Sequence, residues 1–303
     1  VIFYNCFSSI LRAIGDSRTP LIAMVMAACL NVALDLLFVC VFHQGIAGAA
    51  IATLISQLFA ASFCYYKLTK ELPFKITKES FQIDTHLIKQ LIKLGLPLAF
   101  QNLIIAIGGI ILQSVVNGFG FLFIAGYTAT NKVYGILEVV AISFGYAITT
   151  FVSQNFGAKK YQRMKSGVFQ ANILSIFISI VIMISILVLG KKILLLFIST
   201  TPKQTQIVLT YAYDYLVTMA VCLPILYILY SYRSALQGME NTLIPMISGI
   251  VELIMRVSVA LILPQYIGVY GIYLAEVLAW AAAAVMLYIC YHRDLHQLDN
   301  GVV

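Results

Sequence analysis

Long apolar runs separated by short polar segments dominate the sequence. With Gly, Pro and clusters of charge as boundaries, the pattern predicts eight complete helices, each of about 20 residues or more and long enough to cross a bilayer. They lie near residues 20–42, 46–66, 90–117, 121–155, 168–190, 206–232, 243–263 and 268–291. Residues 1–11 form a shorter apolar run before Arg12 and Asp16, so we expect the chain to be a fragment that begins inside a helix. Pro97 and Pro224 lie within spans and predict kinks.

The composition excludes a soluble globular domain. Of the 303 residues, 61% are hydrophobic and only 10% are charged, whereas soluble domains carry about 25% charged residues. The net charge of +7 is spread over short clusters between apolar runs, which is typical of topology signals and not of a nucleic-acid-binding face. We therefore expect an all-α polytopic membrane protein whose partner is the lipid bilayer, with no nucleic acid.

Lys and Arg concentrate in alternate connections between the predicted spans. One set of connections contains Arg12, Arg18, Lys67, Lys70, Lys75, Lys78, Lys89, Lys93, Lys159, Lys160, Arg163, Lys165, Arg233 and Arg293. The other set contains only Lys191, Lys192 and Lys203. The first set is predicted to be cytoplasmic because positive charge accumulates on that side of a membrane.

The chain contains an internal repeat. Shifting it by 225 residues superposes the segment 9–36 on the segment 234–261, and a two-residue gap in the following loop then aligns Gly45 with Gly268 and Gly48 with Gly271. The repeat is inferred from the spacing of these glycines, because chance matches among Leu, Ile and Ala are common in membrane helices. Six helices would separate equivalent positions, so the repeat predicts two six-helix bundles related by an axis along the membrane normal.

The repeat divides the chain into four predicted parts. Residues 1–66 would be the second half of a first bundle, 67–89 a cytoplasmic linker, 90–291 a complete second bundle and 292–303 a cytoplasmic tail. By the repeat, the helices of the second bundle that precede about residue 226 should have equivalents in the first bundle. We expect these equivalents to lie before Val1 in the parent protein.

Several motifs resemble the multidrug and toxic compound extrusion (MATE) family. They are LRAIGDSRTP (11–20), Asn31-x-x-x-Asp35, GIAGAAIAT (45–53), LGLP (94–97), NGFG (117–120), VSQNFGAKKYQRM (152–164) and YRSALQGMENTLIP (232–245). Their order is similar to that of the family from the end of its fourth helix to its twelfth. The resemblance implies a monomeric antiporter of the bacterial plasma membrane with two lobes around a central cavity. Such proteins expel small organic, often cationic, compounds in exchange for Na+ or H+ and use no other cofactor.

Two other functions would require residues of different kinds. An enzyme would be expected to show a clustered metal or nucleophile motif, and the four histidines lie in predicted loops or the tail. A flippase or exporter of lipid-linked oligosaccharides, from the same wider superfamily, is the serious alternative. It would be expected to line its cavity with several Arg residues that meet a pyrophosphate, and Arg256 is the one clear Arg within a predicted span.

Asn31, Asp35 and Thr53 form the candidate cation site. Asn31 lies four residues before Asp35 and so on the same helical face, and Thr53 lies at a similar depth on the next helix. The three offer hard oxygen ligands and one carboxylate, which suits Na+. Burial of Asp35 would instead favour a bound proton, and a purely structural role in helix packing is the alternative to both. The resemblance to the MATE family implies that these three positions match the cation site of that family's first lobe.

The second lobe carries a different set of ionisable residues. Arg256 stands where the repeat has Asn31, Glu276 stands where it has Thr53, and Glu252 lies one turn before Arg256. We expect a fixed, charge-balanced cluster, with a direct role in binding as the alternative. Some family members use carboxylates in the regions 100–109 and 224–230, and these regions contain none here.

Four further residues are candidates for a substrate cavity. Gln113 matches the position opposite a first-lobe aspartate of the family, and its neutral amide favours hydrogen bonding over ion coupling. Lys132 either lines the cavity or extends toward the membrane surface. Tyr227 and Tyr230 offer aromatic faces to flat cations. Glu138, six residues after Lys132, either faces the cavity or bonds a neighbouring helix.

Overall fold

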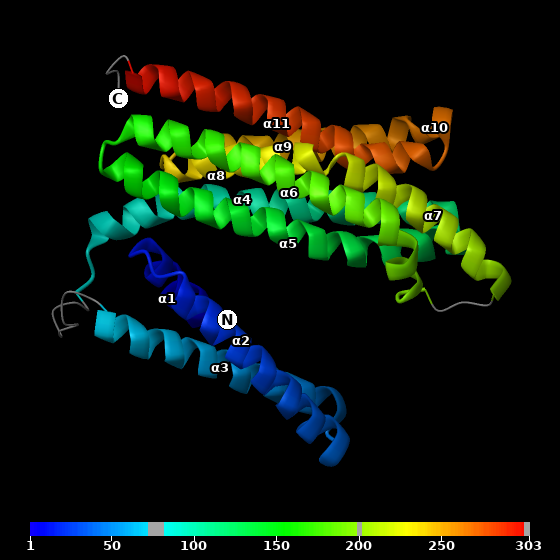
Figure 1. Ribbon diagram of the computed structural model, residues 1–303, viewed down its shortest axis with the longest axis horizontal. Helices are drawn as coiled ribbons and strands as arrows, with labels where there is room; N and C mark the ends of the chain where they lie inside the picture. Colours follow the sequence, from blue (N-terminus) through cyan, green and yellow to red (C-terminus); the bar gives the residue numbers. More distant parts are fainter. Residues whose placement is uncertain (72–81, 199–201, 300–303) are drawn as a thin grey trace. The chain divides into compact units, whose positions relative to one another are not determined.

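The computed structural model describes residues 1–71, 82–198 and 202–299, and all of its regular structure is helical (Figure 1). The chain divides into two compact units, Val1–Asp84 and Thr85–Val303. Seven of the described helices are long and apolar enough to cross a membrane. The predicted class, an all-α polytopic membrane protein, is confirmed.

The described part of the first unit contains three α-helices. They are α1 (Ile2–Ala13), α2 (Arg18–Asp35) and α3 (Gly45–Glu71). A π-helical segment, η1 (Leu36–Val41), continues α2 directly after Asp35. Small residues, including Ala23, Ala60 and Cys64, fill the contacts between the helices and are almost completely buried. Small side chains let membrane helices approach closely, so α3 can pack against both α1 and α2.

The second unit contains eight helices in its described part. They are α4 (Thr85–Val116), α5 (Phe121–Gly157), α6 (Tyr161–Leu195), α7 (Pro202–Val221), α8 (Leu223–Gly238), α9 (Leu243–Ile262), α10 (Pro264–Ile267) and α11 (Tyr270–Asp299). A short 3-10 turn, η3 (Asn117–Phe119), connects α4 to α5. α11 packs along α8 and α9, α4 packs on α9, and α5 contacts α6, α7 and α8.

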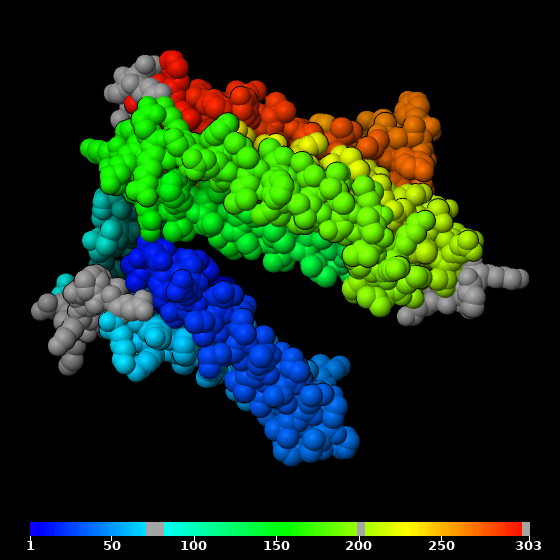
Figure 2. Space-filling model, viewed as in Figure 1, coloured from blue at the N-terminus to red at the C-terminus, as the bar shows by residue number. Residues whose placement is uncertain are grey.

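Aromatic side chains form much of the core of the second unit. Tyr215 stacks on Tyr127 and Tyr273, with ring centroids 5.1 and 5.0 Å apart. On the face drawn in Figure 2, side chains of α5, α6 and α11 cover this core. The outer face of α6 is apolar, with exposed Ile173, Phe177 and Val188. A helix that faces lipid is expected to expose apolar side chains on its outer side, as α6 does.

The predicted span at 206–232 is two helices and not one. α7 and α8 are bent by 49° at Cys222. Pro224 lacks an N–H, and its ring conflicts with the carbonyl four residues before it, so a continuous α-helix is disfavoured there. The predicted kink at Pro224 is confirmed. α4, by contrast, continues through Pro97.

The internal repeat is confirmed by the backbone. Gly45 and Gly268, which the sequence aligns, both have positive φ, +55° and +61°. The Oδ1 atoms of Asp16 and Asn241, also aligned, each accept a hydrogen bond from the backbone N–H three residues later. α1, α2 and α3 thus correspond to α8, α9 and α11, and in both sets the third helix packs on the other two.

The helices extend beyond several predicted boundaries. α3 continues to Glu71 and α4 begins at Thr85, so both enter the predicted linker at 67–89. Within that linker, residues 72–81 lie outside the described residues. α11 continues to Asp299 and includes most of the predicted tail at 292–303. Amphipathic ends of membrane helices carry charge outside the apolar core, so an apolar-run criterion ends these helices too early.

Candidate functional site

The first unit brings Asn31 and Thr53 together. Asn31 lies one turn before the end of α2, and Thr53 lies in the third turn of α3. The amide Nδ2 of Asn31 donates to Oγ1 of Thr53 over 3.5 Å, and that hydroxyl donates to the carbonyl of Ala49 over 3.0 Å. Packing of α2 on α3 therefore positions two of the three predicted cation ligands side by side.

Asp35 is the last residue of α2 and is half-buried. Its Oδ1 is buried and has no hydrogen-bond partner among the described residues, and none of the ion pairs found there includes it. A carboxylate oxygen removed from water without a donor is costly. A cation or a proton would remove this cost, and Asn31, one turn away on the same face, would be its neighbour.

Gln57 was missed by the sequence analysis. It follows Thr53 by four residues on α3, and its Oε1 is also buried without a partner in the described part of the chain. The four-residue spacing after Thr53 was the available signal, since it places both side chains on one helical face. The amide oxygen of Gln57 is a further hard donor beside the predicted ligands.

The second unit brings Glu252, Arg256 and Glu276 together, as the sequence suggested. Nη2 of Arg256 lies 2.8 Å from Oε2 of Glu276 and 4.0 Å from Oε2 of Glu252. Nη1 of the same guanidinium donates to the carbonyl of Ile105 over 3.4 Å. The structural role predicted for the three remains a prediction, but their contacts join α4, α9 and α11.

Arg233 is a fourth member of this charge cluster. The sequence analysis counted it among cytoplasmic charges, and this was wrong, because Arg233 lies inside α8 and is only 5% exposed. Its guanidinium pairs with Glu252 and donates to Ser248 over 3.2 Å. The sequence did contain a signal: Arg256 alone leaves Glu252 and Glu276 with an unbalanced negative charge, which a second buried cation would neutralise. The resulting four-residue cluster has two positive and two negative side chains.

Gly108 lets α4 approach the charge cluster. A Cβ atom at this position would lie 2.9 Å from Nη1 of Arg256 and 3.2 Å from Cδ1 of Leu253. Real side chains avoid such distances, so any other residue would push the guanidinium or the helix away. Gly109, the next residue, has no atom within 4 Å of the equivalent position.

A second polar pair lies beside the charge cluster. The hydroxyl of Tyr230 donates to Oε1 of Glu138 over 2.9 Å, so Glu138 bonds the neighbouring helix α8. The Arg233 guanidinium lies 5.7 Å from the centroid of the Tyr230 ring. Tyr230 and Arg233 also line a cavity of about 350 Å³ with Gln101, Asn102 and Thr149. The cavity wall combines hydroxyl, amide and guanidinium groups with the apolar side chains of Leu98, Ile105 and Ile142.

Two family models match the chain. A family model described as MatE matches residues 97–262, which is more than half of the chain. The chain belongs to the MATE family. A second model, described as lipid II flippase MurJ, matches residues 1–126. The second match covers less than half of the chain and overlaps the first only at its end.

The MATE assignment agrees with individual relatives. A Bacillus subtilis protein named as a probable multidrug resistance protein, YpnP, is 36% identical over 53% of this chain and 36% of its own length. The multidrug export protein MepA of Staphylococcus aureus is 24% identical over 99% of this chain and 67% of its own. The chain therefore spans about one to two thirds of the length of these relatives.

Solved structures share the MATE fold. A MOP superfamily transporter from Pyrococcus furiosus, described as having a binding pocket of reversed polarity, superposes with a TM-score of 0.92. It is 23% identical, and the match covers 98% of this chain and 67% of that one. The predicted architecture, part of a first six-helix bundle followed by a complete second bundle, is confirmed by this similarity.

The four predicted cavity residues have separate surroundings in this MATE protein. Lys132 is exposed and lines a cavity of about 310 Å³ with Phe121 and Phe197. Nε2 of Gln113 donates to Oδ1 of Asn117 over 3.0 Å. The hydroxyl of Tyr227 donates to a carbonyl of α5, that of Leu137, over 3.4 Å. Tyr230 alone lines the cavity beside the charge cluster, so the second unit does not gather the four into one pocket, and their role stays a prediction.

Proposed function

We propose that the protein exports small organic, often cationic, compounds across a bacterial cell membrane and is driven by inward movement of Na+ or H+. Support comes from membership of the MATE family and from relatives named for multidrug resistance and multidrug export. Alternating exposure of a site near the midplane is the mechanism that bundled repeats serve in secondary transporters.

The observation that carries the proposal is the unpartnered carboxylate oxygen of Asp35. It lies one turn from Asn31, which itself contacts Thr53. An ionisable group inside a membrane span is expensive and is a functional candidate by default. In this proposal Asp35 binds the coupling cation, and Asn31, Thr53 and Gln57 supply neutral oxygen ligands suited to Na+. With H+ as the coupling ion, Asp35 alone carries the proton.

A lipid-linked substrate is the second candidate, because the MurJ model matches residues 1–126. A pyrophosphate needs arginines whose donors are available. Arg233 already pairs with Glu252, and Arg256 already pairs with Glu276. This pairing favours organic export over a pyrophosphate-linked substrate.

The test is transport by the full-length protein in proteoliposomes. Ethidium movement is followed by fluorescence under an imposed Na+ gradient and, separately, under an imposed pH gradient. We expect one gradient to drive movement in the wild type and Asp35→Asn to abolish it. Glu240→Gln is the control, since it removes an exposed carboxylate.

Loss of transport in Asp35→Asn is informative only if the variant inserts normally. Removing a membrane-buried charge lowers the insertion cost by roughly 2.5 to 3.5 kcal/mol, so we expect normal yield and thermal stability. Gradient-driven transport that persists in Asp35→Asn would overturn the assignment of Asp35. Transport of a lipid-linked substrate without ethidium movement would favour the second candidate.

A further inference from the structure

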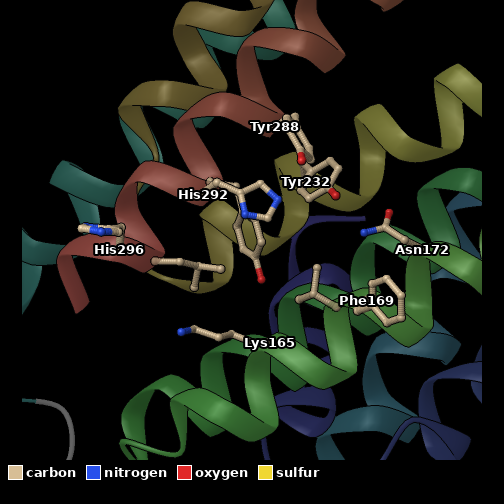
Figure 3. A pocket seen from close by; sticks show the side chains of 10 residues that line it. Lys165, Phe169, Asn172, Tyr232, Tyr288, His292 and His296 are labelled. Carbon is tan, nitrogen blue, oxygen red and sulfur yellow. The ribbon is translucent and has the colours of Figure 1, made fainter. Parts of the chain in front are cut away.

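A cavity of about 570 Å³ lies between α6, α8 and α11, apart from the charge cluster (Figure 3). Its walls include Lys165 and Phe169 from α6, Tyr232 from α8 and His292 from α11. Tyr232 precedes Arg233 on α8, and successive helical side chains point about 100° apart. The helix therefore directs one side chain to the charge cluster and the other to this cavity.

Two buried polar atoms in the cavity wall lack partners. The hydroxyl of Tyr291, a residue 3% exposed, and Oδ1 of Asn172, a residue 8% exposed, have no hydrogen-bond partner within the described residues. Buried polar groups are nearly always satisfied, and each exception calls for an explanation. The phenol needs an acceptor and the amide oxygen needs a donor, so one occupant that carries both groups would satisfy the two atoms together.

The charge of the wall favours an anion. Lys165 is cationic, His292 and His296 add ring nitrogens to the wall, and no Asp or Glu is among the described residues that line the cavity. A phosphate group accepts hydrogen bonds from ammonium, ring N–H and phenol donors. The acceptor that Tyr291 needs is thus supplied by the same group that the lysine attracts.

The shape of the cavity favours an amphiphile. Lys165 and Asn172 are seven residues apart on α6, which is about 10 Å along the helix axis. Between them Phe169 is 66% exposed, and on α11 the rings of Tyr288 and His292, one turn apart, pack with centroids 4.4 Å from each other. A polar end near a basic helix terminus and an exposed apolar flank match the headgroup and chain regions of a lipid.

We propose that this cavity binds a phosphoglycerol headgroup of an anionic membrane lipid. The phosphate accepts hydrogen bonds from Lys165 and the Tyr291 hydroxyl, and a glycerol hydroxyl donates to Oδ1 of Asn172. The acyl chains lie along Phe169 and the exposed flank of α6. The proposal does not depend on the transported substrate or on the coupling ion.

The test is native mass spectrometry of the purified full-length protein titrated with four probes. Phosphatidylglycerol has the phosphate, the hydroxyl and the chains. Phosphatidylmethanol has the same charge and chains without the hydroxyl, phosphatidylcholine is zwitterionic, and glycerol 1-phosphate has no chains. We expect phosphatidylglycerol to bind about tenfold or more tightly than each of the others, as expected for one hydrogen bond to a charged group.

Variants assign the binding to this cavity. Tyr291→Phe and Lys165→Gln should each weaken phosphatidylglycerol binding about tenfold, and Asn172→Leu should remove the preference over phosphatidylmethanol. Arg163→Gln is the matched control, because it removes one positive charge two residues from Lys165 on an exposed side chain outside the cavity. It should leave binding unchanged.

Three results would overturn the proposal. They are equal binding of phosphatidylglycerol and phosphatidylcholine, unchanged binding in Tyr291→Phe and Lys165→Gln, and a loss in Arg163→Gln equal to that in Lys165→Gln. Glycerol 1-phosphate binding as tightly as phosphatidylglycerol would overturn a lipid as the source of the group. Thermal stability of each variant, expected to match the wild type without lipid, separates lost binding from misfolding.

Discussion

The two units place the same pair of positions in contact and fill them with different chemistry. In the first, Asn31 donates to Thr53 over 3.5 Å. In the second, the aligned residues Arg256 and Glu276 form an ion pair of 2.8 Å. Because α2 and α3 correspond to α9 and α11, one backbone arrangement serves a neutral pair in one unit and an ionic pair in the other.

The two pairs also differ in the residues that surround them. Beside the neutral pair, Asp35 has an oxygen with no hydrogen-bond partner among the described residues, and the second unit has Ala260 at the aligned position. Beside the ionic pair, Arg233 and Glu252 complete a cluster with no net charge. In such a cluster each charge already has a partner of opposite sign, which is expected of a structural ion-pair network. The comparison is the basis for proposing ion binding in the first unit and a structural role in the second.

The largest expected effect comes from Arg256→Ala. It leaves Glu276 as an uncompensated buried carboxylate and should cost about 3 to 5 kcal/mol of stability. Double-mutant cycles, read as thermal stability in detergent, should give stronger coupling with Glu276 than with Glu252, since the distances are 2.8 and 4.0 Å. Arg293→Ala is the control, because its pair with Asp294 is exposed on the arginine side and should contribute about 1 kcal/mol or less.

Absence of coupling in both cycles, together with altered substrate affinity in Arg256→Ala, would contradict the scaffold role. Arg256 would then be a substrate-binding residue, and the two units would no longer differ in having a binding role and a structural role.

A smaller effect is expected for Gly108→Ala. The added methyl meets the Arg256 guanidinium, which is held on both sides and cannot simply rotate away. Overpacking of this kind costs about 1 to 3 kcal/mol. Gly109→Ala makes the same chemical change where no atom lies within 4 Å, so its melting temperature should stay at or above that of the wild type. Equal losses in both variants would mean that the close approach of α4 is unimportant.

The smallest effect is expected in the first unit. Asn31→Ala and Thr53→Ala remove one long neutral hydrogen bond, so their coupling in a thermal-stability cycle should be about 1 kcal/mol or less. The same measurement on Arg256 and Glu276 supplies the contrast. Coupling between Asn31 and Thr53 as strong as in the ionic pair would indicate that the first unit is also a scaffold.

The sequence predicted the helices and the repeat for physical reasons that are local. Apolar runs identify spans because hydrocarbon admits few charges, and Gly45 and Gly268 mark the repeat because both adopt positive φ. Arg233 was misplaced because a lone basic residue near a predicted span end is indistinguishable from a topology signal. Arg233 lies inside α8, which begins after the bend at Cys222 and continues to Gly238.

The cavity residues were less predictable than the ion pairs. Opposite charges at matched depths have few alternatives in a membrane, so Arg256 and Glu276 had to meet. The hydroxyls of Tyr227 and Tyr230 had many alternative hydrogen-bond partners. The carbonyl or carboxylate that each one reaches depends on how α8 packs on α5. Sequence patterns specify the depth of such residues but not their partners.

The π-helical segment Leu36–Val41 bears on how the two repeats diverged. The first repeat has two more residues than the second between the positions of Asp35 and Gly45, and the second closes the same interval with the single turn Pro264–Ile267. A π-helical turn closes i→i+5 hydrogen bonds and so holds more residues than an α-helical turn. The longer interval of the first repeat thus includes a wide helical turn directly after Asp35. Insertion and deletion, and not substitution alone, were available to evolution for adjusting the interval that follows this carboxylate.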